Sequence, residues 1–112
     1  MLTAREIVLS FPKRFKGDPL HSYQGVVHFD IDGEDGGQFT VIVKDECTVE
    51  EGLVHEPSIT VRTSDKVYQA IEYGNKNAMQ AILTGDVKVS NMLELMPFTQ
   101  SFHGLLSKKN KL

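Results

Sequence analysis

Hydrophobic and polar residues alternate at every second position through much of the first half of the chain. This pattern is typical of β-strands that bury one face, and it runs from residue 23 to residue 62. A glycine-rich turn at residues 33–37 reverses the chain between the first two strands. The pattern predicts four strands in an antiparallel meander with one apolar face, at residues 23–32, 38–45, 49–54 and 58–62.

A helical pattern precedes these strands. Thr3 and Glu6 have the spacing of a capping box, so a helix is expected to begin there. Its apolar stripe includes Ile7 and Phe11, which are four residues apart and therefore share one helix face. The helix is expected to kink or to restart at Pro12, because proline has no backbone N–H to donate.

The hydrophobic period changes to about 3.6 after the strands, which indicates helices. Ser64 and Asn77 are expected to cap two short helices, and Gly74 and Gly85 are expected to end them. A short strand at residues 87–89 follows.

The last segment, residues 92–106, is unusually apolar for the end of a domain. Its pattern is helical, and Pro97 is expected to interrupt it and to form a hinge.

The order of these elements is helix, four strands, two helices, strand and helix. It predicts an α+β fold, with a five-stranded, mostly antiparallel sheet and helices packed on one face. Because the last strand comes after two helices, it returns to the sheet through a crossover. Such a connection permits one parallel pair of strands.

Length and composition describe one ordinary globular domain. The chain has 112 residues, of which 40% are hydrophobic and 24% charged. We expect a single domain at residues 1–107 and a basic, disordered tail at residues 108–112, which hold three lysines. The net charge of −3 argues against nucleic acid as a partner, because phosphate binding needs a basic field.

Nothing in the sequence indicates a membrane span or a secretory signal. No stretch approaches the roughly 18 apolar residues that a spanning helix needs, and the single Cys47 excludes a disulfide framework. We therefore expect a soluble protein in a reducing, cytoplasmic compartment. The alternative location is the peroxisome, because residues 110–112, Asn-Lys-Leu, are similar to the Ser-Lys-Leu signal.

No composed catalytic or metal site is visible. Residues 30–41 are similar to a calcium loop, but Asp35 and Val41 occupy the positions of its glycine and glutamate. Carboxylates beside Cys47 are expected to raise the pKa of its thiol, which disfavours a nucleophile. We expect no catalytic residue, no metal and no cofactor. An enzyme built on His28 with Asp30 and Asp32 is the least favoured function.

Two segments resemble the sterol carrier protein-2 domain, also called the non-specific lipid-transfer domain. Residues 25–46, GVVHFDIDGEDGGQFTVIVKDE, resemble its opening hairpin. Residues 56–90, EPSITVRTSDKVYQAIEYGNKNAMQAILTGDVKVS, resemble its signature of strand, capped helix, glycine turn, second short helix and strand. The resemblance covers residues 21–103. The chain departs from it at residues 46–47 and 90–91, where the family often has glycine.

This resemblance implies an elongated hydrophobic cavity between the sheet and the helices. Members of the family hold sterols, fatty acids, fatty acyl-CoA or phospholipids there without catalysis. By this resemblance, three groups of residues in this chain would bind the lipid. The floor would be Phe29, Val41, Val43 and Val61, the walls Val67, Ile71, Met79, Ile82 and Leu83, and the lid Met92, Leu93, Met96, Phe98 and Phe102.

The expected function is the non-catalytic binding and carrying of hydrophobic lipids. Burial would drive binding, since each methylene removed from water contributes about 0.8 kcal/mol. The expected partners are a lipid or fatty-acyl ligand and, transiently, a membrane surface. The alternative is an interaction module, in which the cavity is collapsed and the apolar C-terminal segment packs on a partner protein or in a homodimer.

Overall fold

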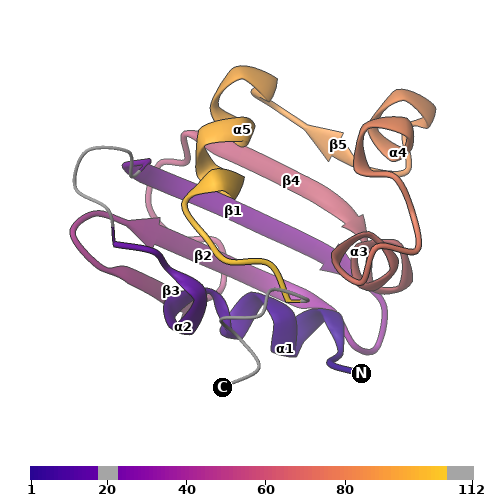
Figure 1. The fold of residues 1–112 in the computed structure, drawn as a ribbon, viewed down its shortest axis with the longest axis horizontal. Helices are drawn as coiled ribbons and strands as arrows, with labels where there is room; N and C mark the ends of the chain where they lie inside the picture. The colour runs from indigo at the N-terminus through magenta and orange to yellow at the C-terminus, as the bar shows by residue number, and fades with distance from the viewer. Residues whose placement is uncertain (18–22, 106–112) are drawn as a thin grey trace.

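The computed structural model describes residues 1–17 and 23–105, and its centre is a five-stranded sheet (Figure 1). The end of the expected domain, residues 106 and 107, and the expected tail at residues 108–112 lie outside the described residues. The strands follow the order β3-β2-β1-β4-β5 across the sheet. Their bounds are β1 Gly25–Asp32, β2 Gly37–Val43, β3 Cys47–Glu51, β4 Ile59–Ser64 and β5 Lys88–Val89.

The sheet contains one parallel pair, formed by β1 and β4. The other neighbouring strands, β1–β2, β2–β3 and β4–β5, are antiparallel. The mixed α+β architecture is therefore as expected, but the prediction of a continuous four-strand meander was wrong. The chain leaves the meander after β3 and crosses to the far side of β1. The parallel pair therefore involves β4, whereas the sequence interpretation placed the crossover before the last strand, β5.

The crossing segment, residues 52–58, is held on the sheet by polar contacts. The Thr40 hydroxyl donates to the carbonyl of Gly52 at 2.7 Å and accepts from the Val54 N–H at 2.9 Å. The His28 ring contacts the Val54 carbonyl at 2.8 Å. Thr40 is fully buried although it is polar, because this segment covers it. His28 and Thr40 alternate along their strands with the residues that face the helices, so the crossing segment lies on the opposite face.

The predicted starts of the helices are confirmed. The Thr3 hydroxyl accepts from the Glu6 N–H at 3.2 Å, and the Glu6 carboxylate accepts from the Thr3 N–H at 2.9 Å. The side chains of Ser64 and Asn77 cap the two helices that follow β4, and Gly85 ends the second of them with a φ of +86°. The helices are α1 Ala4–Leu9, α2 Phe11–Arg14, α3 Asp65–Glu72, α4 Ala78–Thr84 and α5 Met92–Gln100.

Helix α5 is continuous through Pro97, so the expected interruption there is wrong. Proline removes only its own N–H, whose partner would be the carbonyl of Leu93 four residues earlier. Leu93 is 89% exposed, so water can reach this turn of the helix. No helix formed by the described residues is both long and apolar enough to cross a membrane.

The predicted alternation in the strands is confirmed, because the side chains that face the helices are apolar and buried. They are Val27, Phe29, Ile31, Phe39, Val41, Val43, Ile59 and Val61.

The helices cover this face in two different ways (Figure 1). Over β2 and β3, α1 and α2 pack directly on the sheet: the Arg5 guanidinium lies 5.5 Å from the centre of the Phe39 ring, and α2 contacts β3. Over β1, β4 and β5, α3 and α5 approach the sheet from two sides, through Tyr68 and Phe98, whose rings lie 5.8 and 6.0 Å from that of Phe29. The second half of the sheet is therefore only partly covered, and the candidate site lies there.

Candidate functional site

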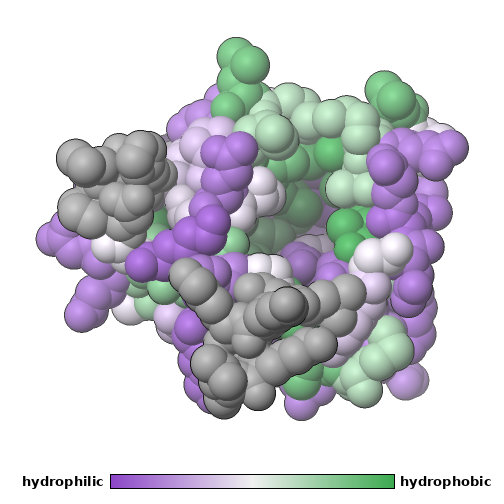
Figure 2. Space-filling model, viewed as in Figure 1, coloured by the Kyte–Doolittle hydropathy of each residue, from purple (hydrophilic) through white to green (hydrophobic). Residues whose placement is uncertain are grey.

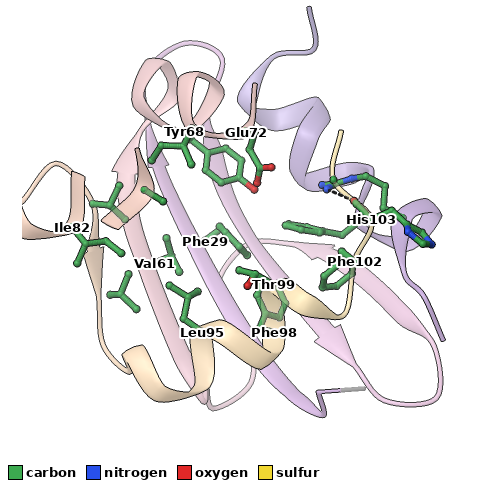
Figure 3. A pocket seen from close by; sticks show the side chains of 17 residues that line it. Phe29, Val61, Tyr68, Glu72, Ile82, Leu95, Phe98, Thr99, Phe102 and His103 are labelled. Carbon is green, nitrogen blue, oxygen red and sulfur yellow. Dashed lines mark hydrogen bonds between the residues drawn. The ribbon is translucent and has the colours of Figure 1, made fainter. Parts of the chain in front are cut away.

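A cavity of about 240 Å³ lies between the sheet and the helices. Phe29 of β1 and Val61 of β4 form its floor, and side chains of α2, α3, α4 and α5 surround it (Figure 3). In the space-filling view the molecule is hollowed at this place, with hydrophobic surface inside and above the hollow and hydrophilic surface to its left (Figure 2). The aliphatic part of the lining consists of Val61, Ile71, Ala78, Ile82, Val87, Val89 and Leu95.

One end of the cavity is closed by packed aromatic rings. The Phe102 ring lies 4.7 Å from that of Phe11 and 5.1 Å from that of Phe98, and the Phe98 ring lies 5.6 Å from that of Phe11. All three residues are buried. Aromatic contacts at these distances add stability beyond the area that they bury, so this cluster holds α2 and α5 together and fixes the end of the cavity.

A buried arginine also lines the cavity. Arg14, at the end of α2, is 5% exposed. Its guanidinium donates three hydrogen bonds, to the Ser10 hydroxyl at 2.9 Å and to the carbonyls of Ile7 and His103, both at 3.1 Å. It also stacks over the Phe11 ring at 4.7 Å. These contacts join α1, α2 and the segment after α5.

Tyr68 of α3 is the second buried polar residue of the lining, at 7% exposure. Its ring packs against Phe29, and its hydroxyl points toward the carboxylate of Glu72 (Figure 3) without a hydrogen bond of good geometry to any described residue. Burial raises the pKa of this phenol well above its ordinary value; the charge of Glu72 raises it further, and that of Arg14 opposes the shift. The phenol is therefore neutral and is a hydrogen-bond donor at physiological pH.

Six of the residues that the resemblance assigned to the lipid line this cavity. They are Phe29, Val61, Ile71, Ile82, Phe98 and Phe102.

Four of the other assigned residues are buried or half-buried, but they do not line the cavity. Val41 and Val43 are fully buried in the half of the sheet that α1 and α2 cover directly. Val67 packs at the edge of the core, and Met92 is half-buried at the start of α5. The floor therefore extends over β1 and β4 rather than over β2.

The last four assigned residues are exposed. Met79 and Leu83 of α4 are 51% and 79% exposed, and Leu93 and Met96 of α5 are 89% and 55% exposed. Leu93 and Met96 do not line the cavity, because α5 turns Leu95, Phe98 and Thr99 toward it instead.

The sequence interpretation did not include Arg14 and Tyr68. A signal for Arg14 was present: it lies seven residues after Ile7 and three after Phe11, which places a basic residue on the apolar side of the first helical segment. Tyr68 is three residues before Ile71 on α3, so the two share a helix face.

The candidate catalytic residues lie away from the cavity. His28 is on the opposite face of the sheet, under the crossing segment. Within residues 1–17 and 23–105, no group of three or more His, Cys, Asp or Glu residues could hold a metal ion.

Cys47 is a buried thiol outside the cavity lining. Burial raises its pKa to about 12, and the charge of Arg14 only partly opposes this shift. The expected direction is confirmed, but the expected cause is not, because desolvation and not the neighbouring carboxylates accounts for the rise.

We expect Cys47 to react with iodoacetamide on the order of 1,000-fold more slowly in the native than in the denatured protein at pH 8, because the native thiolate is scarcer. The thiol is neutral in both states below its ordinary pKa of 9.0. Above pH 9 the unfolded thiol ionises while the folded thiol does not, so this residue lowers stability between pH 9 and pH 12. Mass spectrometry of samples quenched over time, with and without urea, measures the ratio of the two reaction rates. Equal rates in the native and the denatured protein would contradict the burial of Cys47.

This geometry defines a class of protein: an α+β domain with an apolar cavity between its layers. The sequence model of the SCP-2 sterol transfer family matches residues 10–102, so the chain belongs to this family. Membership of the family implies lipid binding or transfer. No curated protein matches the chain.

Solved structures share the fold at low sequence identity. The crystal structure of sterol carrier protein 2 like 2 from Aedes aegypti has a TM-score of 0.68 and 20% identity, over 83% of this chain and 86% of that one. The solution structure of palmitated SCP2L2 from the same organism has a TM-score of 0.68 and 21% identity, over 91% and 97%. The stereoselective inverting sec-alkylsulfatase Pisa1 from Pseudomonas sp. has a TM-score of 0.70 and 16% identity, over 84% of this chain and 15% of the sulfatase.

Proposed function

We propose that the protein binds one lipid at a time in this cavity and carries it in the cytoplasm without chemical change. The observation that carries the proposal is an apolar cavity of about 240 Å³ whose floor is Phe29 and Val61 and whose walls include Ile82 and Leu95. Each methylene buried there would contribute about 0.8 kcal/mol. The palmitated state of SCP2L2 from Aedes aegypti supports a fatty-acyl ligand.

The size of the cavity favours one acyl chain. If a methylene takes about the 30 Å³ that one water molecule takes in the liquid, then 240 Å³ holds on the order of eight such groups. A two-chain phospholipid would require the helices to move apart, whereas a single chain would fill the cavity and extend through its mouth.

We therefore expect the affinity for straight-chain fatty acids to rise about fourfold per methylene up to a length of roughly ten carbons, and then to level off. Displacement of a fluorescent fatty acid from the protein, over a series from six to sixteen carbons, measures this dependence. An affinity that does not change with chain length would contradict binding in the cavity.

Native mass spectrometry of the freshly purified protein tests the function itself. A monomer with the mass of one added lipid, removed by delipidation and restored by added fatty acid, is the expected result. A ligand-free dimer that takes up no fatty acid or sterol would instead support the interaction module.

Exposed apolar residues flank the residues that line the cavity. Leu83 follows the lining residue Ile82, and Leu93 and Met96 flank the lining residue Leu95. We propose that these side chains make the transient contact with a membrane surface during uptake and release. The same side chains would form the contact between copies if the homodimer is the correct alternative.

A further inference from the structure

The sheet ends at β3 with an edge that has no neighbouring strand on its outer side among the described residues. β3 is the outermost strand in the order β3-β2-β1-β4-β5, and it pairs only with β2 (Figure 1). An unpaired edge strand presents backbone N–H and C=O groups with which another extended chain can pair. The opposite edge, β5, has only two residues, so β3 is the longer of the two edges.

Two hydrogen bonds at the ends of β3 define which of its backbone groups bond toward β2. The Lys44 N–H donates to the Glu46 carbonyl at 2.9 Å, and the Gly52 N–H donates to the Gln38 carbonyl at 2.8 Å. Hydrogen-bonded pairs in an antiparallel ladder recur at every second residue. The even-numbered residues from 46 to 52 therefore bond inward, toward β2.

The odd-numbered residues of β3 point their backbone groups outward. Thr48 and Glu50 belong to the inward set, so the N–H and C=O groups of Cys47, Val49 and Glu51 point away from the sheet. No hydrogen bond joins these outward backbone groups to another described residue. Three consecutive outward residues can hold one additional extended strand.

The side chains along this edge are strongly acidic. Residues 45–51 hold four acids and no base. Two of the acids form exposed pairs, Glu51 with Arg5 at 3.4 Å and Glu50 with His55 at 3.2 Å. The other two, at the start of this segment, are exposed and form no ion pair with a described residue. The edge therefore carries a net negative charge.

This charge opposes pairing with a second copy of the chain. Two β3 strands that paired with each other would bring together four acids from each copy. Like charges across neighbouring strands are destabilising, whereas opposite charges stabilise the pair. The charge of the edge instead complements a basic segment of another protein.

The two faces of the edge differ in chemistry. Glu50 is opposite Thr40 in the register, so its side chain lies on the face away from the helices, and Glu46 shares that face by alternation. Val49 is opposite Val41 on the face that the helices cover, and it packs against the core. A strand added at this edge would therefore place basic side chains beside the two glutamates and apolar side chains beside Val49.

We propose that the edge of β3 is a docking surface for a partner protein that supplies an extended segment of alternating basic and apolar residues. The segment pairs with the outward backbone groups of Cys47, Val49 and Glu51 as a sixth strand. In this mode of recognition the backbone hydrogen bonds supply affinity and the alternate side chains supply specificity. None of residues 45–51 lines the cavity, so the inference does not depend on the proposed lipid binding.

The first test uses a fluorescein-labelled heptapeptide in which lysine and valine alternate, and fluorescence anisotropy measures its binding to the full chain. One control peptide has the same composition with its lysines and valines in two separate blocks, and a second has glutamate in place of lysine. We expect the block peptide to bind about tenfold more weakly and the glutamate peptide not to bind. Salt is expected to weaken binding of the alternating peptide, because exposed charges are screened.

Amide hydrogen exchange, followed by NMR, locates the bound peptide. In the free protein the N–H groups of Val49 and Glu51 are expected to exchange faster than those of Thr48 and Glu50, which bond to β2. The alternating peptide is expected to slow exchange at Val49 and Glu51 by about tenfold. Slowing at other strands with none at β3 would overturn the proposed location.

Substitution of Val49 tests the backbone contact directly. Val49→Pro removes an N–H that points outward and leaves the ladder with β2 intact, so the folded variant is expected to lose about tenfold in affinity for the alternating peptide. Val49→Thr keeps the N–H and the β-branched shape, and it is expected to bind within about twofold of the wild type. Glu46→Gln combined with Glu50→Gln leaves the backbone unchanged and is expected to lower the affinity about fivefold and to reduce its salt dependence.

Three results would overturn this inference. The first is equal binding of the alternating peptide by folded Val49→Pro and Val49→Thr. The second is a dimer that protects the Val49 N–H without peptide, because a second copy would then occupy the edge. The third is failure of the wild type to bind the alternating peptide. If binding then appears when the three lysines of residues 108–112 are replaced by glutamine, the occupant is the chain's own basic segment and not a partner.

Discussion

Replacement of Ile82 by tryptophan is expected to lower the affinity for decanoate by about 50-fold while the protein stays folded. Ile82 lines the cavity from α4 and is only half-buried, so a larger side chain can enter the cavity without forcing the sheet and the helix apart. An indole that displaces three methylenes of the ligand removes about 0.8 kcal/mol for each, which corresponds to about fourfold per methylene. Isothermal titration of delipidated protein measures the loss.

The neighbouring residue supplies a control. Leu83→Trp introduces the same side chain on the same helix, but Leu83 is 79% exposed and does not line the cavity. Its affinity for decanoate is expected to equal that of the wild type. If both variants lose affinity equally, or neither does, the ligand binds somewhere other than this cavity.

The strands and the helix boundaries were predictable because both depend on local patterns. Alternation of apolar and polar residues requires one buried face. Thr3, Ser64 and Asn77 could be recognised as caps because each hydrogen bond closes within three residues.

The partner of β4 was not predictable from such patterns. Residues 52–58 contain turn-forming residues, but nothing local states whether the chain turns back beside β3 or crosses to the far side of β1. The crossing depends on contacts between distant residues, such as those of Thr40 with Val54 and of His28 with the same carbonyl.

The candidate site was predictable in part for a related reason. Periodicity identifies the face of the sheet on which a residue lies, but not which helix lies above it. Phe29 and Val41 share one face, yet only Phe29 lines the cavity, because α1 and α2 pack directly over the half of the sheet that contains Val41. Likewise, the resemblance assigned Leu83 and Leu93 to the site by segment, although both side chains are exposed.

The polar residues of the cavity are the part that sequence reasoning could not assemble. Arg14 and Tyr68 are 54 positions apart, and each looks ordinary in its own helix. Both are buried and line one cavity, and neither property can be read from spacing.

The difference between the two halves of the sheet leads to the second large effect, which concerns stability. Phe39→Ala and Phe98→Ala are each expected to lower the free energy of unfolding by about 3–5 kcal/mol, because both side chains are 1% exposed and tightly packed. Phe39 lies under Arg5 in the half that α1 and α2 cover directly. Phe98 packs against Phe11 and Phe29 and lines the cavity. Urea denaturation of the delipidated variants measures both losses.

The two variants are expected to differ in ligand binding although they lose similar stability. Phe39→Ala leaves a hole that is separate from the cavity lining, so the affinity of the folded fraction for decanoate should not change. Phe98→Ala enlarges the cavity itself, so longer or branched chains gain affinity relative to decanoate. Binding is measured below the temperature at which either variant unfolds. If both variants change the chain-length preference to the same extent, the two halves of the sheet are not functionally distinct. Stability and ligand capacity would then reside in one undivided core.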